Sequence, residues 1–546
     1  MRVVLDSRFR TWLPRLVLVA VVGTFAVLAW LRFWYNDDVF ITFRYARHLA
    51  DGHGLVWNVD DGDPVEGTTS LGWCALIAAA MRAGLDPLVA SHYLGLVSGI
   101  AGLVLVYLAG RRLLGLSPWM ALVAPALLAA HRQWVLWSVS GLETQTATVL
   151  AFAATLQMAR EQEAHRSGWL ASGLMFFLAT LFRPETPLLH LAAGIGIVLS
   201  LGSLASVRRV VLSGVVHGAL VGLLTVWRLS YFGQPLPNTF YAKVGALQPD
   251  TGLVYLGQFL LQTHGYLWLP VLVVGCLLVT RGAPVLWSMA GLQLACWIVW
   301  IVLFGGGRWE FRFLEPVLPD LALMLAFSLI VFDQESWLGR ALGTRLALVC
   351  PAIVSVLLIV SQAATSFVSF RTFDEVYSVQ ILTRAATNTL REGALLSAYL
   401  TRSDRIATGW AGAIPFMTGA WHFDTWGLND SEIARRPFDT TSPLFHQRHA
   451  TWQDIVKREV MFCDAFNQFV YPRPYPPQQL PRIRRVPWTE PGVPIYCLRL
   501  RPDAFWIFAS PRPREEIESW ARNKGLTLQY VIPLPASIPP LFGDGS

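Results

Sequence analysis

The chain has 546 residues, of which 54% are hydrophobic and 14% charged, and its net charge at pH 7 is +7. Soluble globular proteins usually carry about 25% charged residues. The composition therefore excludes a chain that is soluble and globular throughout, and it indicates many membrane spans. The positive charge is almost entirely arginine, which cytoplasmic loops of membrane proteins collect. No basic run with interleaved aromatic residues is present, so we expect no nucleic-acid partner.

The N-terminus carries Arg2, Arg8, Arg10 and Arg15 around the start of the first apolar run. This run is long enough to span a bilayer and lacks a cleavage site of small residues. We therefore expect a retained first helix rather than a cleaved signal peptide.

Eleven apolar runs have the length of membrane spans. They cover residues 13–33, 88–110, 118–136, 146–159, 168–182, 187–205, 209–227, 266–280, 283–304, 313–332 and 346–363. The run 69–84 is short, so we interpret it as a re-entrant or interfacial helix. The result is a polytopic α-helical membrane protein with about eleven transmembrane helices.

Arginines set the expected orientation. The groups predicted to be cytoplasmic are Arg8 to Arg15, Arg111 and Arg112, Arg160 and Arg166, Arg208 and Arg209, Arg281, and Arg340 with Arg345. The N-terminus is then cytoplasmic. The segments expected on the outer face are 34–68, 131–145, 183–186, 228–265, 305–313 and everything after about 365.

The composition changes near residue 365, where apolar runs become short and Asp, Asn, Pro and Arg increase. We expect a transmembrane domain over 1–365 and an extracytoplasmic mixed α/β domain over 366–546, with an extended proline-rich loop at 472–495. Cys463 and Cys497 lie in this outer part and could form a disulfide there. The six cysteines show no metal-binding spacing.

Two adjacent carboxylates, Asp37 and Asp38, follow the first apolar run in "LRFWYNDDVFITFRYARHLADGHGLVWN". Acids at the membrane surface suit transfer of a sugar from a lipid-linked donor, because one can act as general base on an acceptor hydroxyl. The other could orient the acceptor or hold a divalent cation, or a carboxylate could stabilise an oxocarbenium-like centre. An ordinary helix N-cap is the simpler alternative.

The outer segments hold further candidates. Cations that could meet a lipid phosphate are Arg44, Arg183, Lys243, Arg308 and Arg312. Candidates for contact with the sugars are His53, Glu66, Glu143, Glu185, Asn238, Tyr241 and Trp309. Each of these residues taken singly fits a loop, turn or cap, but their gathering on one predicted face favours a site.

Several blocks together resemble the membrane glycosyltransferases of the GT-C class. They are "NDDVFITFRYARHLADGHGLVWN", "DPVEGTTSLGW", "SGLETQ", "RPE", "YFGQPLPNTFYAK", "GRWEFRFLEPVLP" and "DTWGLND". Within that class the resemblance is to the terminal β-(1→2)-arabinofuranosyltransferases of mycobacterial and corynebacterial arabinan synthesis, over about residues 30–435.

The resemblance implies a bacterial plasma-membrane enzyme. Its donor would be decaprenyl-phosphoryl-arabinofuranose, and its acceptors the ends of arabinan in arabinogalactan or lipoarabinomannan. Asp37 and Asp38 would match the family's essential acidic pair. In that family both donor and product linkages are β, so an Asp could serve as base, nucleophile or ion-pair stabiliser.

Three alternatives stay open at this point. Where the family tends to read "EGYTN", residues 66–70 read "EGTTS", so another lipid-linked sugar could be the donor. A transporter or flippase would place ionisable residues at mid-membrane in repeated halves, and no half-repeat is visible in the sequence. A glycan-binding scaffold could use Trp410, Trp421, Trp426 and Trp452 for stacking.

Overall fold

The computed structural model describes residues 7–163, 169–245, 247–278, 284–332, 344–368, 370–373, 376–439, 447–475 and 484–541. Arg2, Arg166, Arg281, Arg340 and part of the proline-rich loop, for which predictions were made, lie outside these ranges. The chain divides into two compact units. We call Met1–Trp34, Asp86–Leu224 and Ala246–Val379 the membrane unit, and Tyr35–Leu85, Thr225–Gly245 and Gln380–Ser546 the sheet unit.

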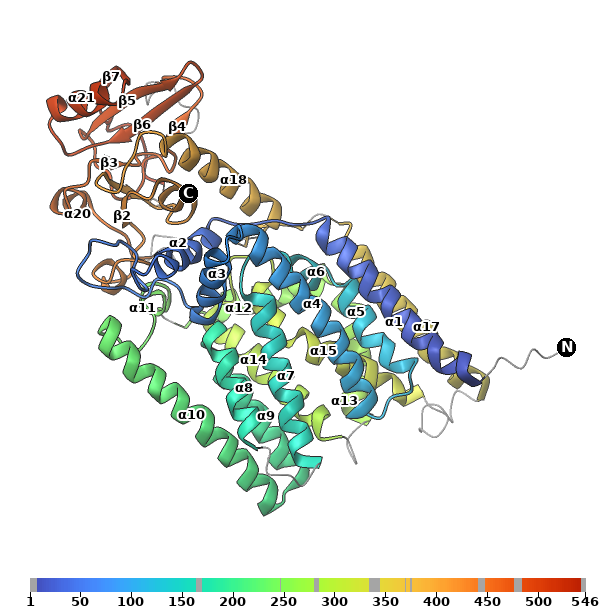
Figure 1. Ribbon diagram of the computed structural model, residues 1–546. Helices are drawn as coiled ribbons and strands as arrows, with labels where there is room; N and C mark the ends of the chain where they lie inside the picture. The colour runs from blue at the N-terminus through green and yellow to red at the C-terminus, as the bar shows by residue number, and fades with distance from the viewer. Residues whose placement is uncertain are drawn as a thin grey trace. The chain divides into compact units, whose positions relative to one another are not determined.

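The membrane unit consists of helices (Figure 1). Its helices are α1 (Ser7–Trp30), α4 (Pro87–Arg112), α5 (Val123–Ala130), α6 (Arg132–Trp137), α7 (Thr144–Glu163), α8 (Trp169–Phe182), α9 (Thr186–Leu201), α10 (Leu204–Phe232), α12 (Pro249–Gln262), α13 (Gly265–Leu278), α14 (Val285–Phe304), α15 (Leu318–Ser328) and α17 (Thr344–Thr365). The last turns of α10 belong to the sheet unit.

Close helix packing in this unit depends on small residues. Helix α9 packs against α14, and α7 packs against α8. A Cβ atom added at Gly196 on α9 would lie 2.8 Å from the Cα of Met289 on α14. Small residues at such contacts let helix backbones approach closely, as is common between membrane helices.

Within the described residues, every predicted span coincides with helical structure, but many of the helices are short. Among the described residues, four helices are long and apolar enough to cross a bilayer, namely Trp12–Trp30, Pro87–Arg112, Leu204–Phe232 and Val285–Phe304. Helices α12 and α13 form a fifth candidate that is bent by 101°. The polytopic helical architecture is thus confirmed, whereas the number of eleven spans stays a prediction.

The predicted non-crossing segment 69–84 is helix α3 (Leu71–Arg82), which belongs to the sheet unit and packs against α2 (Asp38–Ala50). Its 12 residues are too few for the ~20 that a span requires. This agrees with the expectation that the segment does not cross.

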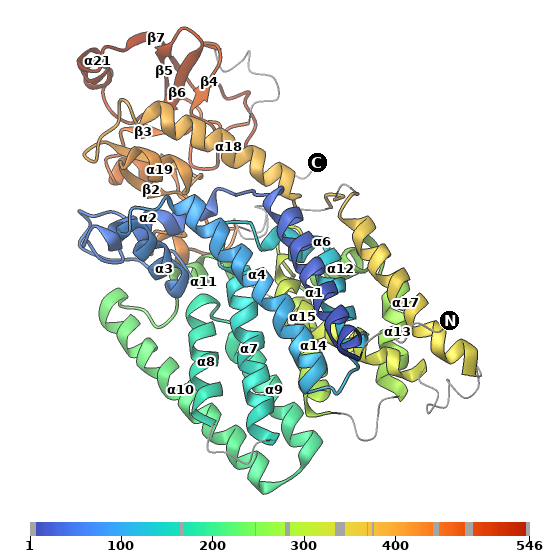
Figure 2. The ribbon, with the colours of Figure 1, turned by 45° about the vertical axis from the view of Figure 1, so that its right-hand side comes forward.

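In the described C-terminal part of the sheet unit, seven strands form a mixed sheet (Figure 2). The strand order is β2-β1-β3-β6-β5-β7, and β4 also pairs with β6. The strands are β1 (Arg405–Thr408), β2 (Trp421–Asp424), β3 (Phe462–Cys463), β4 (Val470–Tyr471), β5 (Pro494–Arg501), β6 (Ala504–Ala509) and β7 (Thr527–Pro533). Strand β1 is parallel to β2 and β3, whereas β6 is antiparallel to its partners.

The sheet has apolar cores on both faces because successive side chains point to opposite sides. Ala407 and Ile507 lie in one core, and Ile406 and Trp506 in the other. The continuous apolar run of β6, buried at all six residues, suits a strand covered on both faces. The remaining helices of the unit are α11 (Asn238–Lys243), α18 (Val379–Leu396), α19 (Ala413–Thr418), α20 (Trp452–Lys457) and α21 (Arg514–Asn523).

The disulfide suggested for Cys463 and Cys497 does not form, since both thiols are free and buried. Cys463 lies on β3 and Cys497 on β5, and strand β6 separates them. The pairing that the sequence left open is therefore excluded. The sequence showed that both cysteines belong to one domain, but it could not show the strand between them.

Candidate active site

Asp37 lies at the N-cap of α2, at the place where the chain leaves helix α1. It is 6% exposed, and its carboxylate accepts three hydrogen bonds. The donors are Thr389 Oγ1 at 2.8 Å, Gly412 N at 2.7 Å and Ala413 N at 3.0 Å. Burial raises the pKa of Asp37 to about 6, although the bonds from Ala413 and Thr389 lower it. Asp37 thus joins the N-terminus of α2 to that of α19.

Gly412 is required for this junction. A Cβ atom at position 412 would lie 1.9 Å from the backbone oxygen of Asp37 and 2.5 Å from its Oδ2. Asp38, by contrast, is the first residue of α2 and is only half-buried. Of the two acids, Asp38 therefore has the greater access to solvent.

Arg44 is buried one turn and a half along α2 and binds carbonyl and amide oxygens. Its Nε donates to Trp57 O at 2.8 Å, and its terminal nitrogens donate to Pro415 O, Asn58 Oδ1 and Ala420 O at 2.5–3.0 Å. Burial lowers the pKa of Arg44 to about 9. Four of its five N–H donors are used, so a phosphate could receive at most one.

Glu66 forms a buried ion pair. Its carboxylate accepts hydrogen bonds from Nε and Nη2 of Arg228 at 2.9–3.2 Å, and Glu66 is 2% exposed. Burial raises the pKa of Glu66 despite the bond to Arg228. The pair connects the segment after α2 to the end of α10 within the sheet unit.

Asn238 connects the same region to the "DTWGLND" block. Its backbone N–H donates to Glu66 O at 2.9 Å, and its side chain donates to the carbonyls of Gly427, Leu428 and Asp430 at 2.8–3.3 Å. Three motifs that are distant in sequence thus meet here. Glu66 and Asn238 were predicted to bind substrate, and their contacts hold this junction together.

The other candidates of the sheet unit are more dispersed. The Tyr241 ring on α11 stacks with Arg435, whose guanidinium carbon lies 4.6 Å from the ring centre. Lys243 is half-buried at the end of α11. His53 is exposed in the loop after α2, where its ring lies 6.3 Å from that of His48.

A second polar group lies in the membrane unit. Glu143, just before α7, accepts hydrogen bonds from Arg312 Nη2 at 2.6 Å and from Arg183 Nη1 at 3.2 Å. Arg183 also binds Glu185 at 2.7 Å, and Arg312 donates to Thr144 Oγ1 at 2.8 Å. Burial raises the pKa of Glu143, but Arg312 and Arg183 outweigh it and hold the pKa below its ordinary value.

Aromatic rings surround this charge group. The guanidinium carbon of Arg312 lies 4.9 Å from the ring centre of Trp309, and that of Arg183 lies 5.5 Å from that of Phe313. Arg308, in the same loop, donates to Tyr377 OH at 3.3 Å. The structure thus brings together the predicted residues Glu143, Glu185, Arg183, Arg312 and Trp309, which three separate sequence blocks supply.

Two polar features of the membrane unit were not predicted. Arg132 pairs with the fully buried Glu310 at 2.5 Å, and Val379 N donates to the same carboxylate at 2.9 Å. Glu310 stands inside the block "GRWEFRF", between residues that were singled out. Arg308, Trp309 and Arg312 in the same block were selected as candidates, so the position of Glu310 among them could have indicated its importance.

The other unpredicted feature is a chain of hydrogen bonds through α7, α8, α9 and α10. Successive contacts of 2.6–3.1 Å join Glu161, Ser172, Ser213, His190, His217 and Thr180. The histidines inside apolar runs could have indicated this chain, because ionisable residues at membrane depth are costly and are usually kept for a function.

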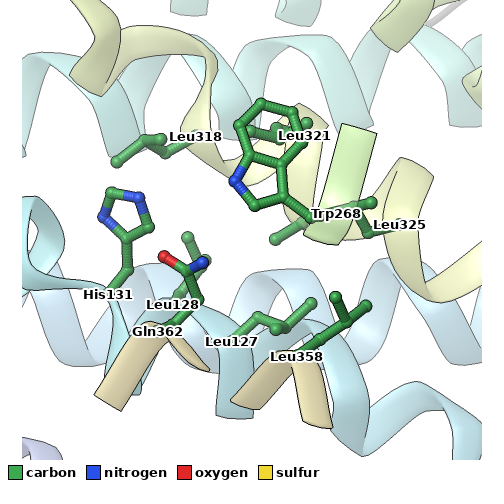
Figure 3. Close-up of a pocket in the computed structure, with 10 residues that line it drawn as sticks. Leu127, Leu128, His131, Trp268, Leu318, Leu321, Leu325, Leu358 and Gln362 are labelled. Carbon is green, nitrogen blue, oxygen red and sulfur yellow. The ribbon is translucent and has the colours of Figure 1, made fainter. Parts of the chain in front are cut away.

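An apolar cavity of the membrane unit lies between α5, α13, α15 and α17 (Figure 3). Leucines line most of it, and the His131 ring and Gln362 amide lie on one side. Its volume is about 30 Å³, which is room for about one water molecule. It is too small to hold a sugar or an isoprenoid unit. Within the described residues, no group of three or more His, Cys, Asp or Glu side chains could hold a metal ion.

Comparison with solved structures defines the class of fold. The crystal structure of ArnT from Cupriavidus metallidurans bound to undecaprenyl phosphate matches with a TM-score of 0.50 and 16% identity, over 74% of this chain and 84% of that chain. The apo structure of the same protein matches with a TM-score of 0.51 and 15% identity, over 76% and 86%. The fold is therefore that of a GT-C type polytopic membrane protein.

The sequence comparison is more specific. The chain is 29% identical over 298 residues to the terminal β-(1→2)-arabinofuranosyltransferase of Mycobacterium tuberculosis (strain ATCC 25618 / H37Rv), which covers 50% of this chain and 45% of that protein. The chain thus spans about half the length of this relative. Residues 378–496 also match a family described as a domain of unknown function (DUF8728). The resemblance expected from the motifs is confirmed.

Proposed function

We propose that the chain is a membrane glycosyltransferase that uses a polyprenyl-phosphate sugar. The proposed donor is decaprenyl-phosphoryl-arabinofuranose, and the proposed acceptors are the ends of cell-wall arabinan in arabinogalactan or lipoarabinomannan. The proposed location is a bacterial plasma membrane, with the N-terminus cytoplasmic and the sheet-bearing part outside. The similarity to an arabinofuranosyltransferase supports the choice of sugar.

The observation that carries this proposal is the acidic pair directly after helix α1. Asp37 is held by three donors and cannot turn toward a substrate without losing them. We therefore assign Asp37 a positioning role, in which it fixes the first turn of α2. Asp38 is the adjacent carboxylate with greater exposure, and we assign it contact with the reacting sugar.

The proposed step exchanges one bond at the anomeric carbon for another. The bond from C1 to the lipid-phosphate oxygen breaks, and a bond from C1 to the acceptor oxygen forms. In an inverting reaction, the Asp38 carboxylate takes the proton of the acceptor hydroxyl as general base. In a retaining reaction, the same carboxylate either attacks C1 and is then displaced by the acceptor oxygen, or stabilises the positive charge of C1 while that oxygen attacks. In either retaining route the departed phosphate takes the proton of the acceptor hydroxyl. In both cases the lipid phosphate leaves as an anion.

The arginines of the membrane unit are the proposed binding residues for a lipid phosphate. Arg183, Arg308 and Arg312 supply three positive charges, against the two negative charges of Glu143 and Glu185. Guanidinium groups bind phosphate oxygens in a bidentate manner. The two carboxylates hold the guanidiniums in place, and a phosphate would exchange with them. A divalent cation at the acidic pair is a further option, which a chelator would test.

A second candidate donor is another polyprenyl-phosphate sugar. The sequence "EGTTS" at residues 66–70 favours it, because Thr68 and Ser70 replace a Tyr and an Asn of the usual family pattern. Both residues are buried in this chain. Smaller side chains at these positions change the space next to Glu66, so a panel of lipid-linked pentoses and hexoses is the appropriate assay.

The test uses the purified full-length protein in detergent, each lipid-linked sugar and an arabinan oligosaccharide, with products identified by mass spectrometry. We expect a product extended by one arabinofuranose, and loss of that product in Asp38→Asn. Asp63→Asn is the matched control, because Asp63 is an exposed acid of the following loop. Failure of the wild-type protein to extend any acceptor with any donor would refute the proposal.

A further inference from the structure

A polar cleft lies at the opposite end of α2 from the acidic pair, entirely within the sheet unit. Its volume is about 180 Å³, and Arg47, His48 and Asp51 of α2 line it together with Arg402 from the loop before β1. A smaller recess also contacts His48 and Arg402 and extends to Asp60 and Trp421. We call the two together the α2–α19 cleft, because the end of α19 forms its other wall.

The exposed side chains of this cleft offer both donors and acceptors. Arg402, Asp51 and Asp60 are exposed, and Trp421 is half-buried. In the described part of the chain, Arg402 makes neither a hydrogen bond nor an ion pair. A guanidinium and two carboxylates can bind alternating hydroxyl donors and acceptors, and Trp421, whose ring already contacts Arg405, borders the recess. This is the chemistry that recognises sugars.

Three arginines and two aspartates line the cleft, and the contacts of two of these arginines reduce its attraction for an anion. Arg44 and Arg47 donate to the carbonyls of Pro415, Phe416 and Ala420 at the end of α19. Their charge is therefore partly offset by the negative end of that helix. Asp51 and Asp60 would repel a phosphate or carboxylate at the rim. A neutral glycan is not repelled by these two carboxylates.

The distance from the acidic pair indicates which sugars would bind. The residues of α2 that line the cleft run from Arg44 to Asp51, which at 1.5 Å per residue lie about 9–20 Å along the helix from Asp38. A sugar undergoing transfer at Asp38 therefore cannot fill the cleft. An acceptor chain of several sugars can reach both.

We propose that the α2–α19 cleft binds acceptor sugars remote from the end being extended. This inference rests on the proposed transferase function and adds to it a preference for long acceptors. The cavity is smaller than the 300–1,000 Å³ of typical ligand pockets, so it would hold about one sugar ring of the chain.

The test compares Arg402→Ala with wild type on a disaccharide and an octasaccharide acceptor. We expect Arg402→Ala to raise KM for the octasaccharide by roughly tenfold, with KM for the disaccharide and both kcat values unchanged. Arg499→Ala is the matched control, because Arg499 is an exposed arginine on β5 outside the cleft. Equal changes for both acceptors, or none for either, would overturn the proposal.

Two further measurements separate this inference from the proposed function. If the wild-type protein transfers no sugar, binding of the octasaccharide is measured by calorimetry. Weaker binding to Arg402→Ala then supports the cleft, and equal binding overturns it. If inorganic phosphate competes with the octasaccharide in the wild type but not in Arg402→Ala, the cleft is an anion site and the proposal is wrong.

Discussion

The buried pair Glu66–Arg228 gives a prediction that separates a structural role from a substrate-binding role. Both side chains are nearly inaccessible, and Arg228 donates to Glu66 at 2.9–3.2 Å through two nitrogens. Breaking a buried pair by removing one partner costs about 3–5 kcal/mol, whereas replacing both by apolar residues of similar volume is often nearly neutral. We therefore consider Glu66→Met, Arg228→Met and the double variant.

The two single variants should differ. Glu66→Met leaves a buried guanidinium without its partner carboxylate, so we expect the full cost of about 3–5 kcal/mol. Arg228→Met leaves a carboxyl group whose pKa is already raised by burial. That group can become neutral, so the cost should be smaller. In the sheet unit of about 240 residues, 1 kcal/mol corresponds to roughly 2–4 °C in Tm.

The assay is thermal unfolding in detergent, followed by tryptophan fluorescence at one scan rate. We expect Glu66→Met to lower Tm by about 10 °C, and the double variant to recover most of the loss together with transferase activity. A double variant as unstable as Glu66→Met would refute the ion-pair account. Recovery of Tm without activity would show that Glu66 contacts substrate directly.

Three further perturbations test other parts of the structure. Gly412→Ala should destabilise the protein by more than about 2 kcal/mol, because its Cβ would meet Asp37 at 1.9 Å; Gly62→Ala, where the Cβ meets nothing within 4 Å, should leave Tm unchanged. Glu392→Gln should flatten the pH dependence of stability. Burial raises the pKa of Glu392 to about 8, so the folded state binds a proton that the unfolded state has already lost. Stability of the wild type should then fall as pH rises from about 4.5 to 8, and an unchanged slope in Glu392→Gln would contradict this cause. His217→Leu should cost about 1–3 kcal/mol, since it interrupts the chain between His190 and Thr180; Leu223→Ala, at a 66% exposed position on the same helix, is the control, and equal Tm values would argue against the chain.

The helical architecture could be predicted from the sequence, because long apolar runs can only be spans or buried helices. It was less informative about helix ends. The single apolar run 118–136 contains two helices, α5 and α6, which meet at His131. The division of the chain was also hard to foresee. The loop segments 35–85 and 225–245 group with the C-terminal residues, and hydropathy contains no information on such long-range contacts.

The sequence predicted which polar residues belong to the candidate site, but not which side chains they contact. Arg183 and Arg312 were selected as free cations for a phosphate, whereas the structure pairs both with Glu143. Glu66 was selected as a sugar ligand, and its partner Arg228 lies in an apolar helix more than 160 positions away. Polarity at a predicted surface indicates that a residue has a polar partner. It does not indicate whether that partner is a substrate or another side chain.

The transfer assay with Asp38→Asn tests the central claim most directly. With decaprenyl-phosphoryl-arabinofuranose and an arabinan oligosaccharide, we expect the wild-type protein and Asp63→Asn to form the extended product. We expect Asp38→Asn to lower kcat by roughly 10²–10⁴-fold, as for loss of a general base, at unchanged Tm. Wild-type kcat in a folded Asp38→Asn variant would contradict the account, because the acidic pair would then take no part in the reaction.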